Sequence, residues 1–454
     1  MKHLNDDTIA AIATPMGMGG VGIVRISGPQ AKCILSKLFQ LPSNQAINSH
    51  QMLHGFIVCP VSNRHLDEVM ACFMQAPKSF TGEDVVEVYC HGGQAVLQEV
   101  LSLVIKQGAR LAERGEFTKR AFVNGKLDLS QAEAVLDLVK APTAKGAGLA
   151  LAQLEGRLSK TVNDLRARLI KIQAELEGVI DFSDDLPELN YNRLQDDLKA
   201  IREEIDGLLA SASSGRIYRQ GLATAIIGKP NVGKSSLLNA LLQEERAIVT
   251  EIPGTTRDTI EELIDLQGFP LRIIDTAGLR HTKDIVEGSG IARTEKEIAA
   301  ADFVLIVLDR SHELDEQDTL VLEKAKGRPG IIVLNKSDLP KAMNTKGLAR
   351  PVIELSALTG AGLSDLSSLI INELQKLLGQ ETSCSVIINA RHQECLTRAD
   401  SSLAKALETV AKKMSAEFVA VDMKEAIVAL GEVTGEIVSD DLINAIFDEF
   451  CIGK

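Results

Sequence analysis

Apolar residues recur at helical spacing in two blocks of the chain, from about residue 127 to 214 and from about residue 384 to the end. Their intervals of four and three residues place them on one side of a helix, and charged residues fill the positions between them. The clearest series is Leu194, Leu198, Ile201, Ile205 and Leu208. We therefore expect a helical domain that is built from both blocks.

Shorter apolar runs predict strands. Between the two helical blocks, continuously apolar runs at 222–227, 331–334 and 352–355 are typical of buried strands. Before the first block the pattern is mixed, with strand candidates at 23–26 and 85–89 and an amphipathic helix after the second candidate. These patterns predict α/β structure both at the N-terminus and in the middle of the chain.

The order of these patterns predicts a multidomain α/β protein. A chain of 454 residues is long enough for about three domains. We expect a mixed N-terminal domain, a discontinuous helical domain, and an α/β domain inserted into the helical one, with a boundary at the Ser- and Gly-rich stretch 211–215. The predicted ranges are 1–123, 124–214, 215–380 and 381–454.

Composition narrows the possible partners. Hydrophobic residues make up 45% of the chain and charged residues 24%, as in ordinary globular proteins. Aromatic residues are only 3%, which does not favour extensive base stacking. The formal net charge of -13 argues against a general polyanion binder, because phosphate contacts need clustered Lys and Arg. A nucleic-acid substrate is therefore expected to bind selectively or with the help of a partner.

The cysteines and the N-terminal residues indicate a compartment. The 7 cysteines are an odd number without a C-x-x-C pair, so they indicate neither a disulfide framework nor a zinc site. The first residues lack the apolar core of a signal peptide, and the longest apolar runs are too short to cross a membrane. We expect a soluble, cytoplasmic protein with no membrane partner.

The residues after the run at 222–227 match a phosphate-binding loop. Gly228, Gly233, Lys234 and Ser235 meet the pattern G-x-x-x-x-G-K-[ST] between a strand and a helical run. The backbone N–H groups of such a loop point at phosphate oxygens, the Lys reaches the outer phosphates and the Ser hydroxyl ligates Mg²⁺. A plain glycine turn is the alternative, and the loop by itself does not separate ATP from GTP.

Three further motifs follow later strands. In Asp275-Thr-Ala-Gly278 the Asp can hold the Mg²⁺ shell through water and the Gly N–H can meet the γ-phosphate. In Asn335-Lys-Ser-Asp338 the last carboxylate can accept both the ring N–H and the exocyclic amine of guanine. Adenine offers an acceptor there and would leave a charge unpaired. The backbone of Ser356-Ala357 can contact the guanine oxygen.

The order of these motifs resembles the translation-factor-related GTPases. The resemblance implies GTP binding by the following residues: Gly228, Asn231, Val232, Gly233, Lys234, Ser235, Thr250, Thr255, Thr256, Asp275, Thr276, Ala277, Gly278, Asn335, Lys336, Asp338, Ser356 and Ala357.

Two departures from the Ras-like pattern concern catalysis. Leu279 follows D-T-A-G, where many GTPases carry the Gln that orients the attacking water. The loop 249–258, together with Asn231, resembles a subgroup that uses K⁺ in place of an arginine finger. That resemblance implies a K⁺ site and, on Ser235 and Thr256, a Mg²⁺ site. The implied K⁺ ligands are Asn231, Thr250, Ile252 and Thr255.

Three more stretches resemble one family. Residues 115–133, the loop 80–87 and the C-terminal Phe450-Cys-Ile-Gly-Lys454 are similar to those of the MnmE (TrmE) family of tRNA modification GTPases, and the resemblance spans the whole chain. It implies an N-terminal tetrahydrofolate-binding-like domain that forms a homodimer, a discontinuous all-helical domain, and an inserted Ras-like P-loop G domain. It also implies a complex with the FAD-dependent protein MnmG (GidA), which together with this chain adds an aminomethyl or carboxymethylaminomethyl group to the five-position carbon of the wobble uridine of tRNA.

The family resemblance also implies ligands and catalytic residues. A folate such as 5-formyltetrahydrofolate is expected at Arg25, Glu87, Lys126 and Lys454, where a glutamate can pair with the donor edge of the pterin and cations with the glutamyl tail. Taken singly, these are ordinary surface charges. Glu287 corresponds to a water-orienting glutamate that acts when two G domains pair. Cys451 is a candidate for the folate or uridine chemistry, and a small buried thiol is the competing interpretation.

A second functional class remains open. A ribosome-assembly GTPase of the Era or Der kind would share the nucleotide motifs without any modification chemistry. The folate-like N-terminal domain and the terminal Cys-Ile-Gly-Lys454 argue against it. Folate binding separates the two classes, because an assembly switch predicts none.

Overall fold

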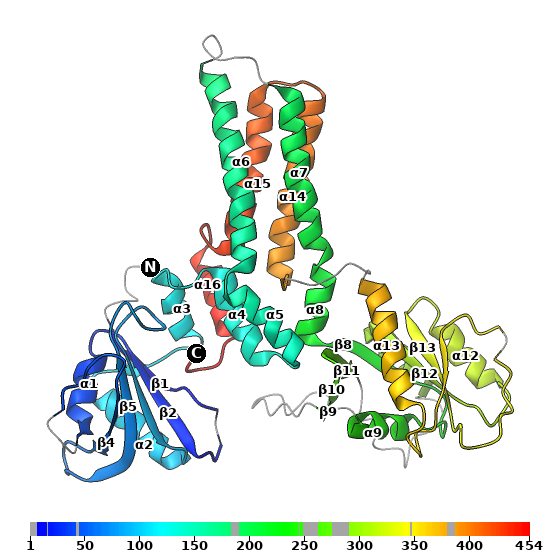
Figure 1. The fold of residues 1–454 in the computed structure, drawn as a ribbon, viewed down its shortest axis with the longest axis horizontal. Coiled ribbons are helices and arrows are strands. Elements are labelled where there is room, and N and C mark those ends of the chain that lie inside the picture. The colour runs from blue at the N-terminus through cyan, green and yellow to red at the C-terminus, as the bar shows by residue number, and fades with distance from the viewer. Residues whose placement is uncertain are drawn as a thin grey trace. The chain divides into compact units, whose positions relative to one another are not determined.

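The computed structural model describes residues 7–15, 17–41, 45–182, 190–244, 246–247, 262–274, 290–345, 347–378 and 386–454. The chain packs as two compact units, and each unit is assembled from separate stretches of sequence (Figure 1). The first unit comprises Met1–Leu136, Leu158–Tyr191 and Lys405–Lys454, and the second comprises Asp137–Arg157 and Asn192–Ala404. The domain boundaries expected after residues 123, 214 and 380 stay predictions.

The first unit contains a seven-stranded sheet with the order β3-β4-β5-β6-β2-β1-β7. Along β2, buried and more exposed residues alternate, because successive side chains point to opposite faces of the sheet. One face packs against α1 and α2, and the predicted strands at 23–26 and 85–89 are confirmed as parts of β2 and β6. The elements are β1 (Ile9–Ile12), β2 (Val21–Ser27), α1 (Ala31–Leu38), β3 (Phe39–Gln40), β4 (Met52–Val58), β5 (His65–Met74), β6 (Val85–His91), α2 (Gln94–Lys106) and β7 (Arg110–Leu111).

Helices complete the first unit. They are α3 (Glu116–Val123), α4 (Leu129–Lys140), α6 (Arg157–Asp181), α15 (Ala416–Thr434) and α16 (Asp440–Asp448). The apolar stripe of α6 is buried, and an ion pair between Arg166 and Glu436 joins α6 to the segment after α15. Helix α16 packs on α3 through Phe447 and Phe122, whose ring centroids are 6.4 Å apart. After α16, Ile452 forms an isolated antiparallel bridge with Arg114, which lies between β7 and α3.

The second unit contains a sheet with the order β14-β13-β12-β8-β11-β10-β9. Strands β8, β12 and β13 are parallel and almost wholly buried, because α9 and α13 cover one face and α11 and α12 the other. The strands are β8 (Leu222–Ile227), β9 (Arg246–Ala247), β10 (Glu262–Leu266), β11 (Phe269–Ile273), β12 (Phe303–Asp309), β13 (Gly330–Asn335) and β14 (Val352–Glu354). The helices are α9 (Lys234–Glu244), α11 (Gly290–Ala300), α12 (Glu316–Lys324) and α13 (Leu363–Leu378).

Four more helices belong mainly to the second unit. They are α5 (Ala144–Leu154), α7 (Tyr191–Ala210), α8 (Ala212–Gln220) and α14 (Ala390–Ala411). The predicted series from Leu194 to Ile205 forms the buried stripe of α7. The stretch 211–215, predicted to mark a boundary, is the beginning of α8, and α8 leads directly into β8. Within the described residues, no helix is long and apolar enough to cross a membrane.

Candidate functional site

The phosphate loop lies between β8 and α9, as the sequence predicts. Strand β8 ends at Ile227 and α9 begins at Lys234, so the N–H groups of the first helical turn face the loop, the arrangement that favours an anion. Gly233 has φ 99°, and a Cβ there would lie 2.1 Å from Asn335 Nδ2. Only glycine fits this backbone and this space.

Lys234 lies across its own loop. Its Nζ donates to the carbonyl oxygens of Gly228 at 2.7 Å and Lys229 at 2.9 Å. Burial lowers the pKa of Lys234. The Lys234 ammonium is therefore held inside the phosphate loop. A phosphate oxygen that binds there would replace the two carbonyl oxygens as its hydrogen-bond acceptor.

Lys229 ties the loop to α12. Its Nζ contacts Asp315 at 2.7 Å and Asp318 at 2.8 Å, and these two residues also form the capping box of α12. Hydrogen bonding from Lys229 lowers the pKa of Asp315 to about 2. The first half of the phosphate loop is thus fixed from outside the nucleotide site.

Asn335 connects the phosphate loop to the base-reading loops. Its Nδ2 donates to the carbonyl of Val232 at 2.8 Å, and its Oδ1 accepts from the N–H of Ala357 at 2.9 Å. Strands β8, β12 and β13 run parallel, so their carboxyl ends meet at one edge of the sheet. One buried amide therefore joins motifs that lie about a hundred residues apart in sequence.

Asp338 is oriented by Ser356. The Ser356 hydroxyl donates to Asp338 Oδ1 at 2.5 Å, and the Asp338 side chain is otherwise exposed. The preceding Lys336 pairs with Asp309 at the end of β12, at 2.6 Å. Burial opposes the charge of Asp309, but the hydrogen bonds from Lys336 and Ser311 hold its pKa below the ordinary value. The Asp338 carboxylate, oriented by Ser356 and otherwise exposed, can accept two N–H donors from a base.

A second polar cluster lies on the N-terminal sheet, on strands β2 and β6. Arg25 of β2 and Glu87 of β6 are cross-strand partners, and Arg25 Nε donates to Glu87 Oε1 at 2.8 Å. Tyr89 donates to the other oxygen at 2.7 Å. Burial, and next the hydrogen bond to Glu87, raise the pKa of Tyr89 to about 12. The Arg25 guanidinium also lies over the rings of Phe80 and Phe117.

The C-terminal tail reaches this cluster. Arg25 Nη1 donates to the carbonyl of Gly453 at 3.2 Å, and burial, followed by the charge of Arg25, lowers the pKa of Lys454. Cys451 is exposed, so the competing interpretation of a buried thiol is wrong. Lys126 is held on the loop that precedes β6, where its Nζ donates to the Pro77 carbonyl at 3.2 Å.

Comparisons with known proteins identify the family. The family described as "GTP-binding protein TrmE N-terminus" matches residues 8–126, and the one described as "MnmE helical domain" matches residues 129–451. A protein of Heliobacterium modesticaldum named tRNA modification GTPase MnmE is 46% identical to this chain and covers 99% of both chains. One of Geobacillus kaustophilus with the same name is 45% identical, again over 99% of both. This chain belongs to the MnmE family.

Some solved structures are similar to part of this MnmE family chain. The G domain of the T. maritima FeoB iron transporter is 29% identical over 34% of this chain and 99% of that chain, with a TM-score of 0.26. Era in complex with MgGDPNP and a fragment of 16S ribosomal RNA is 26% identical over 34% of this chain and 56% of that chain, with a TM-score of 0.25. The expected fold class, with a TrmE-type N-terminal domain, a helical domain and a Ras-like G domain, is confirmed by the family matches and the two sheets.

Several residues expected to act in MnmE chemistry lie outside the described residues. They are Thr250, Ile252, Thr255, Thr256, Asp275, Thr276, Ala277, Gly278 and Glu287, together with Leu279. Of the expected cation ligands, Asn231 and Ser235 are described. Asn231 is exposed on the phosphate loop with φ 65°, a conformation that Asn tolerates better than most residues. Ser235 lies in the first turn of α9.

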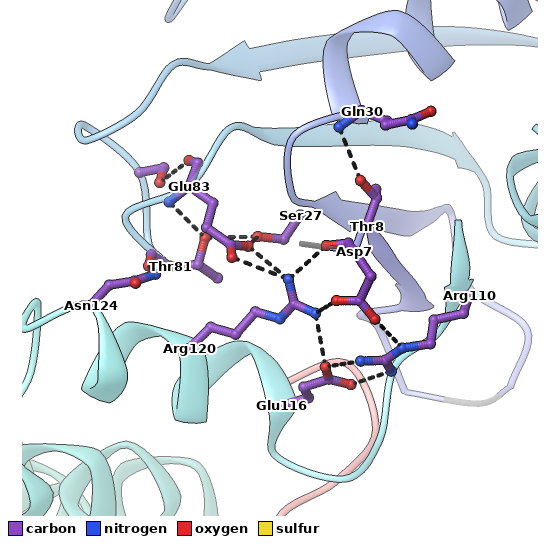
Figure 2. Close-up of polar contacts among 11 residues, drawn as sticks. Asp7, Thr8, Ser27, Gln30, Thr81, Glu83, Arg110, Glu116, Arg120 and Asn124 are labelled. Atoms are coloured by element: carbon purple, nitrogen blue, oxygen red, sulfur yellow. Dashed lines mark hydrogen bonds and ion pairs between the residues drawn. The ribbon is translucent and has the colours of Figure 1, made fainter. Parts of the chain in front are cut away.

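No sequence motif of this MnmE family chain predicted the ionic cluster around Arg120, which is shown in Figure 2. Arg120 of α3 has no exposed surface, and its guanidinium lies between the carboxylates of Asp7, Glu83 and Glu116. Arg110 of β7 pairs with Asp7 and Glu116 as well. Burial opposes the negative charge of Asp7 and Glu116, but hydrogen bonds from the two arginines lower both pKa values.

The local sequence contained only part of the signal for this cluster. Glu116 and Arg120 stand four residues apart within the stretch 115–133, the spacing of an ion pair on one helix. Asp7 and Glu83 come from distant segments of the chain, so no local sequence pattern predicts their contacts with Arg120. The cluster fixes the N-terminal segment, β7, α3 and the loop before β6 to one another beside the Arg25 site.

Proposed function

We propose that this chain is a GTP hydrolase that acts in tRNA modification, as the name of its MnmE relatives says of them. The observation that supports GTP as the nucleotide most directly is the Asn335 bridge, which sets the phosphate loop beside the Ser356-Ala357 loop. Asp338, oriented by Ser356, would then accept from the donor edge of guanine. An adenine base would leave that carboxylate without donors, which strongly disfavours it.

The phosphates bind to the N–H groups of the loop and of the first turn of α9, and Lys234 contacts the outer phosphates. Ser235, with Thr256, would hold Mg²⁺, which neutralises phosphate charge, and Asp275 and Gly278 serve the Mg²⁺ shell and the γ-phosphate. Asn231 would hold K⁺ with oxygens of Thr250, Ile252 and Thr255, adding positive charge where negative charge gathers in the transition state. Glu287 orients the water when two G domains pair.

The N-terminal site is proposed to bind 5-formyltetrahydrofolate or a related tetrahydrofolate. Glu87 is held in place by Arg25 and Tyr89, so its carboxylate is set to accept from the pterin, while Arg25 and Lys454 attract the glutamyl carboxylates. Lys126 adds a cation on the neighbouring loop. Cys451 is exposed on the tail that reaches Arg25, which suits a reactive thiol better than a structural one.

The remaining parts of the proposal concern partners and product. We infer a cytoplasmic homodimer that joins the FAD-dependent protein MnmG and modifies the five-position carbon of the wobble uridine of tRNA. GTP hydrolysis drives a conformational cycle in this complex. The family membership and the motifs described above support this inference.

The test is GTP turnover by the full chain in K⁺ and in Na⁺ at equal ionic strength, with Asn231→Ala alongside. We expect strong stimulation by K⁺ that is lost in the variant, because the amide oxygen is a proposed K⁺ ligand. The control is Asn63→Ala, since Asn63 is also an exposed asparagine with positive φ, in the turn between β4 and β5. Equal slow rates in both salts would favour an assembly switch that depends on an external activating protein.

A further inference from the structure

The turn between β10 and β11 is held by helices from outside the nucleotide-binding sheet. The turn consists of Gln267 and Gly268, both with positive φ, the geometry of a tight two-residue hairpin. Helices α5 and α8 lie against this end of the sheet within the second unit (Figure 1). Helices α5 and α8 therefore contact the β10–β11 hairpin of the G domain.

Helix α5 contacts the hairpin through a hydrogen bond and through cation–π contacts. Thr143, the N-cap of α5, donates its hydroxyl to the carbonyl of Gly268 at 3.0 Å. Lys145 Nζ lies 4.3 Å from the ring centroid of Phe269 and 4.9 Å from that of Tyr218, and these two rings are 5.2 Å apart. Thr143, Tyr218 and Phe269 are all buried, so the contact is packed and not a chance touch between surface groups.

The fit at the turn is close. A Cβ on Gly268 would lie 3.2 Å from Lys145 Cβ, so the helix approaches the turn as nearly as a glycine allows. The Gly268 N–H is also bonded to Asp265 at 2.6 Å, which fixes the turn on the hairpin side. Any displacement of the hairpin along its axis must move α5 or break these contacts.

The hairpin occupies a position that matters for catalysis. Strand β11 pairs in parallel with β8, which leads into the phosphate loop, and Ile274 donates to Thr224 at 3.0 Å. In sequence, the loop 249–258 precedes β10 and the D-x-x-G motif at 275–278 follows β11. The hairpin therefore joins the two segments that carry the proposed K⁺, Mg²⁺ and γ-phosphate ligands.

We propose that Lys145 and Thr143 are positioning residues for GTP hydrolysis: by holding the β10–β11 turn, α5 sets the hairpin that carries both flanking catalytic segments. Linkage makes the effect reciprocal, so the nucleotide state that shifts the hairpin also shifts α5. The inference rests on the proposed GTPase function and adds to it the route by which the G domain acts on the helices before it in sequence.

The test compares Lys145→Met with wild type in the full chain. The methionine keeps the apolar stem and removes the charge over the two rings. We expect kcat for GTP in K⁺ to fall about five-fold, the factor associated with one cation–π contact, while KM and the affinity for GDP stay unchanged. Lys145→Arg should restore kcat, because Arg also binds aromatic faces. The matched control is Lys160→Met, at an exposed lysine of α6, which should behave as wild type.

Hydrogen exchange supplies a second measurement. If Lys145 only stabilised packing, the exchange of the α5 amides would not depend on the bound nucleotide. In wild type, a non-hydrolysable GTP analogue should change the exchange of the α5 amides relative to GDP, and Lys145→Met should reduce that change. An unaltered kcat in Lys145→Met overturns the inference, as does a loss of GDP affinity in proportion to kcat. A wild-type chain without GTP turnover would instead overturn the proposed function.

Discussion

A single amide side chain organises the nucleotide site at the scale of residues. The Asn335 amide donates to the phosphate loop and accepts from the Ser356-Ala357 loop, and its side chain is buried. Buried hydrogen bonds of this kind contribute little when made, but they are costly to leave half made. The geometry of both loops therefore depends on one residue at the end of β13.

We expect Asn335→Ala to lower the affinity for GDP by about 10- to 100-fold, because the Val232 carbonyl and the Ala357 N–H lose their partner, at about 1–3 kcal/mol in total. Titration with a fluorescent GDP analogue measures this. Asn48→Ala is the control, since Asn48 is an exposed asparagine whose amide bonds only Gln51 among the described contacts. Equal affinities for Asn335→Ala and Asn48→Ala would contradict the bridging role.

At the scale of elements, the Arg120 cluster joins α3, β7, the N-terminal segment and the loop before β6. Removing the arginine would take away the arginine partner of Glu83. It would leave Asp7 and the fully buried Glu116 with Arg110 alone. We expect Arg120→Met to lower the free energy of unfolding of the N-terminal unit by about 3–5 kcal/mol, measured in urea. The control Arg64→Met breaks only an exposed pair with Glu99 and should cost less than about 1 kcal/mol.

The same cluster predicts a pH dependence. The folded-state pKa values of Asp7 and Glu116 lie below their ordinary values of 3.8 and 4.5, so the two groups stabilise the fold above those values. This stability is lost as the pH falls below about 5 and through the lowered pKa values. Arg120→Met should weaken this acid dependence without abolishing it, because Arg110 still pairs with both carboxylates. Urea unfolding between about pH 6 and 3 measures the change. An equally steep acid loss in the variant would assign the effect to other groups.

Sequence patterns predicted the elements better than the contacts between them. The helix at 194–208 and the strand before the phosphate loop follow from local periodicity, which the core preserves. The Ser- and Gly-rich stretch 211–215 is typical of a loop, but Gly215 lies inside α8, where a Cβ would be 3.0 Å from the backbone of Ile388. Close approach of a distant segment explains that glycine better than a loop does.

The site residues also differ in how far the local sequence predicted them. Motif spacing predicted the phosphate loop and Asp338, because each motif is local to one strand end. The Asn335 bridge depends on the register of three parallel strands, and the Arg120 cluster on segments far apart in sequence. No local pattern contains that information.

At the scale of the whole molecule, each unit is held together by contacts between segments that lie far apart in sequence. In the first unit the last residues meet β2, through Gly453 and Arg25. In the second, α5 and α8 hold a hairpin of the G domain. The folate proposal and the GTP proposal therefore rest on different units and are open to separate tests.

Deletion of Gly453 and Lys454 tests that separation. We expect the truncated chain to bind 5-formyltetrahydrofolate at least about ten-fold more weakly, because the cation at 454 and the brace on Arg25 are lost. GTP turnover in K⁺ should stay unchanged, since the nucleotide site lies in the other unit. Isothermal titration and a turnover assay on the same preparation measure both. Wild-type folate affinity after deletion would remove the tail from the site.

The central claim, that this chain hydrolyses a guanine nucleotide read by Asp338, is tested most directly by nucleotide preference in wild type and Asp338→Asn. The amide offers a donor in place of one acceptor, and it matches xanthine, whose carbonyl replaces the exocyclic amine of guanine. We predict that wild type turns over GTP and not ATP, and that Asp338→Asn loses GTP turnover at low nucleotide concentration and gains turnover of XTP. Turnover of ATP by wild type, or unchanged GTP preference in the variant, would contradict the account.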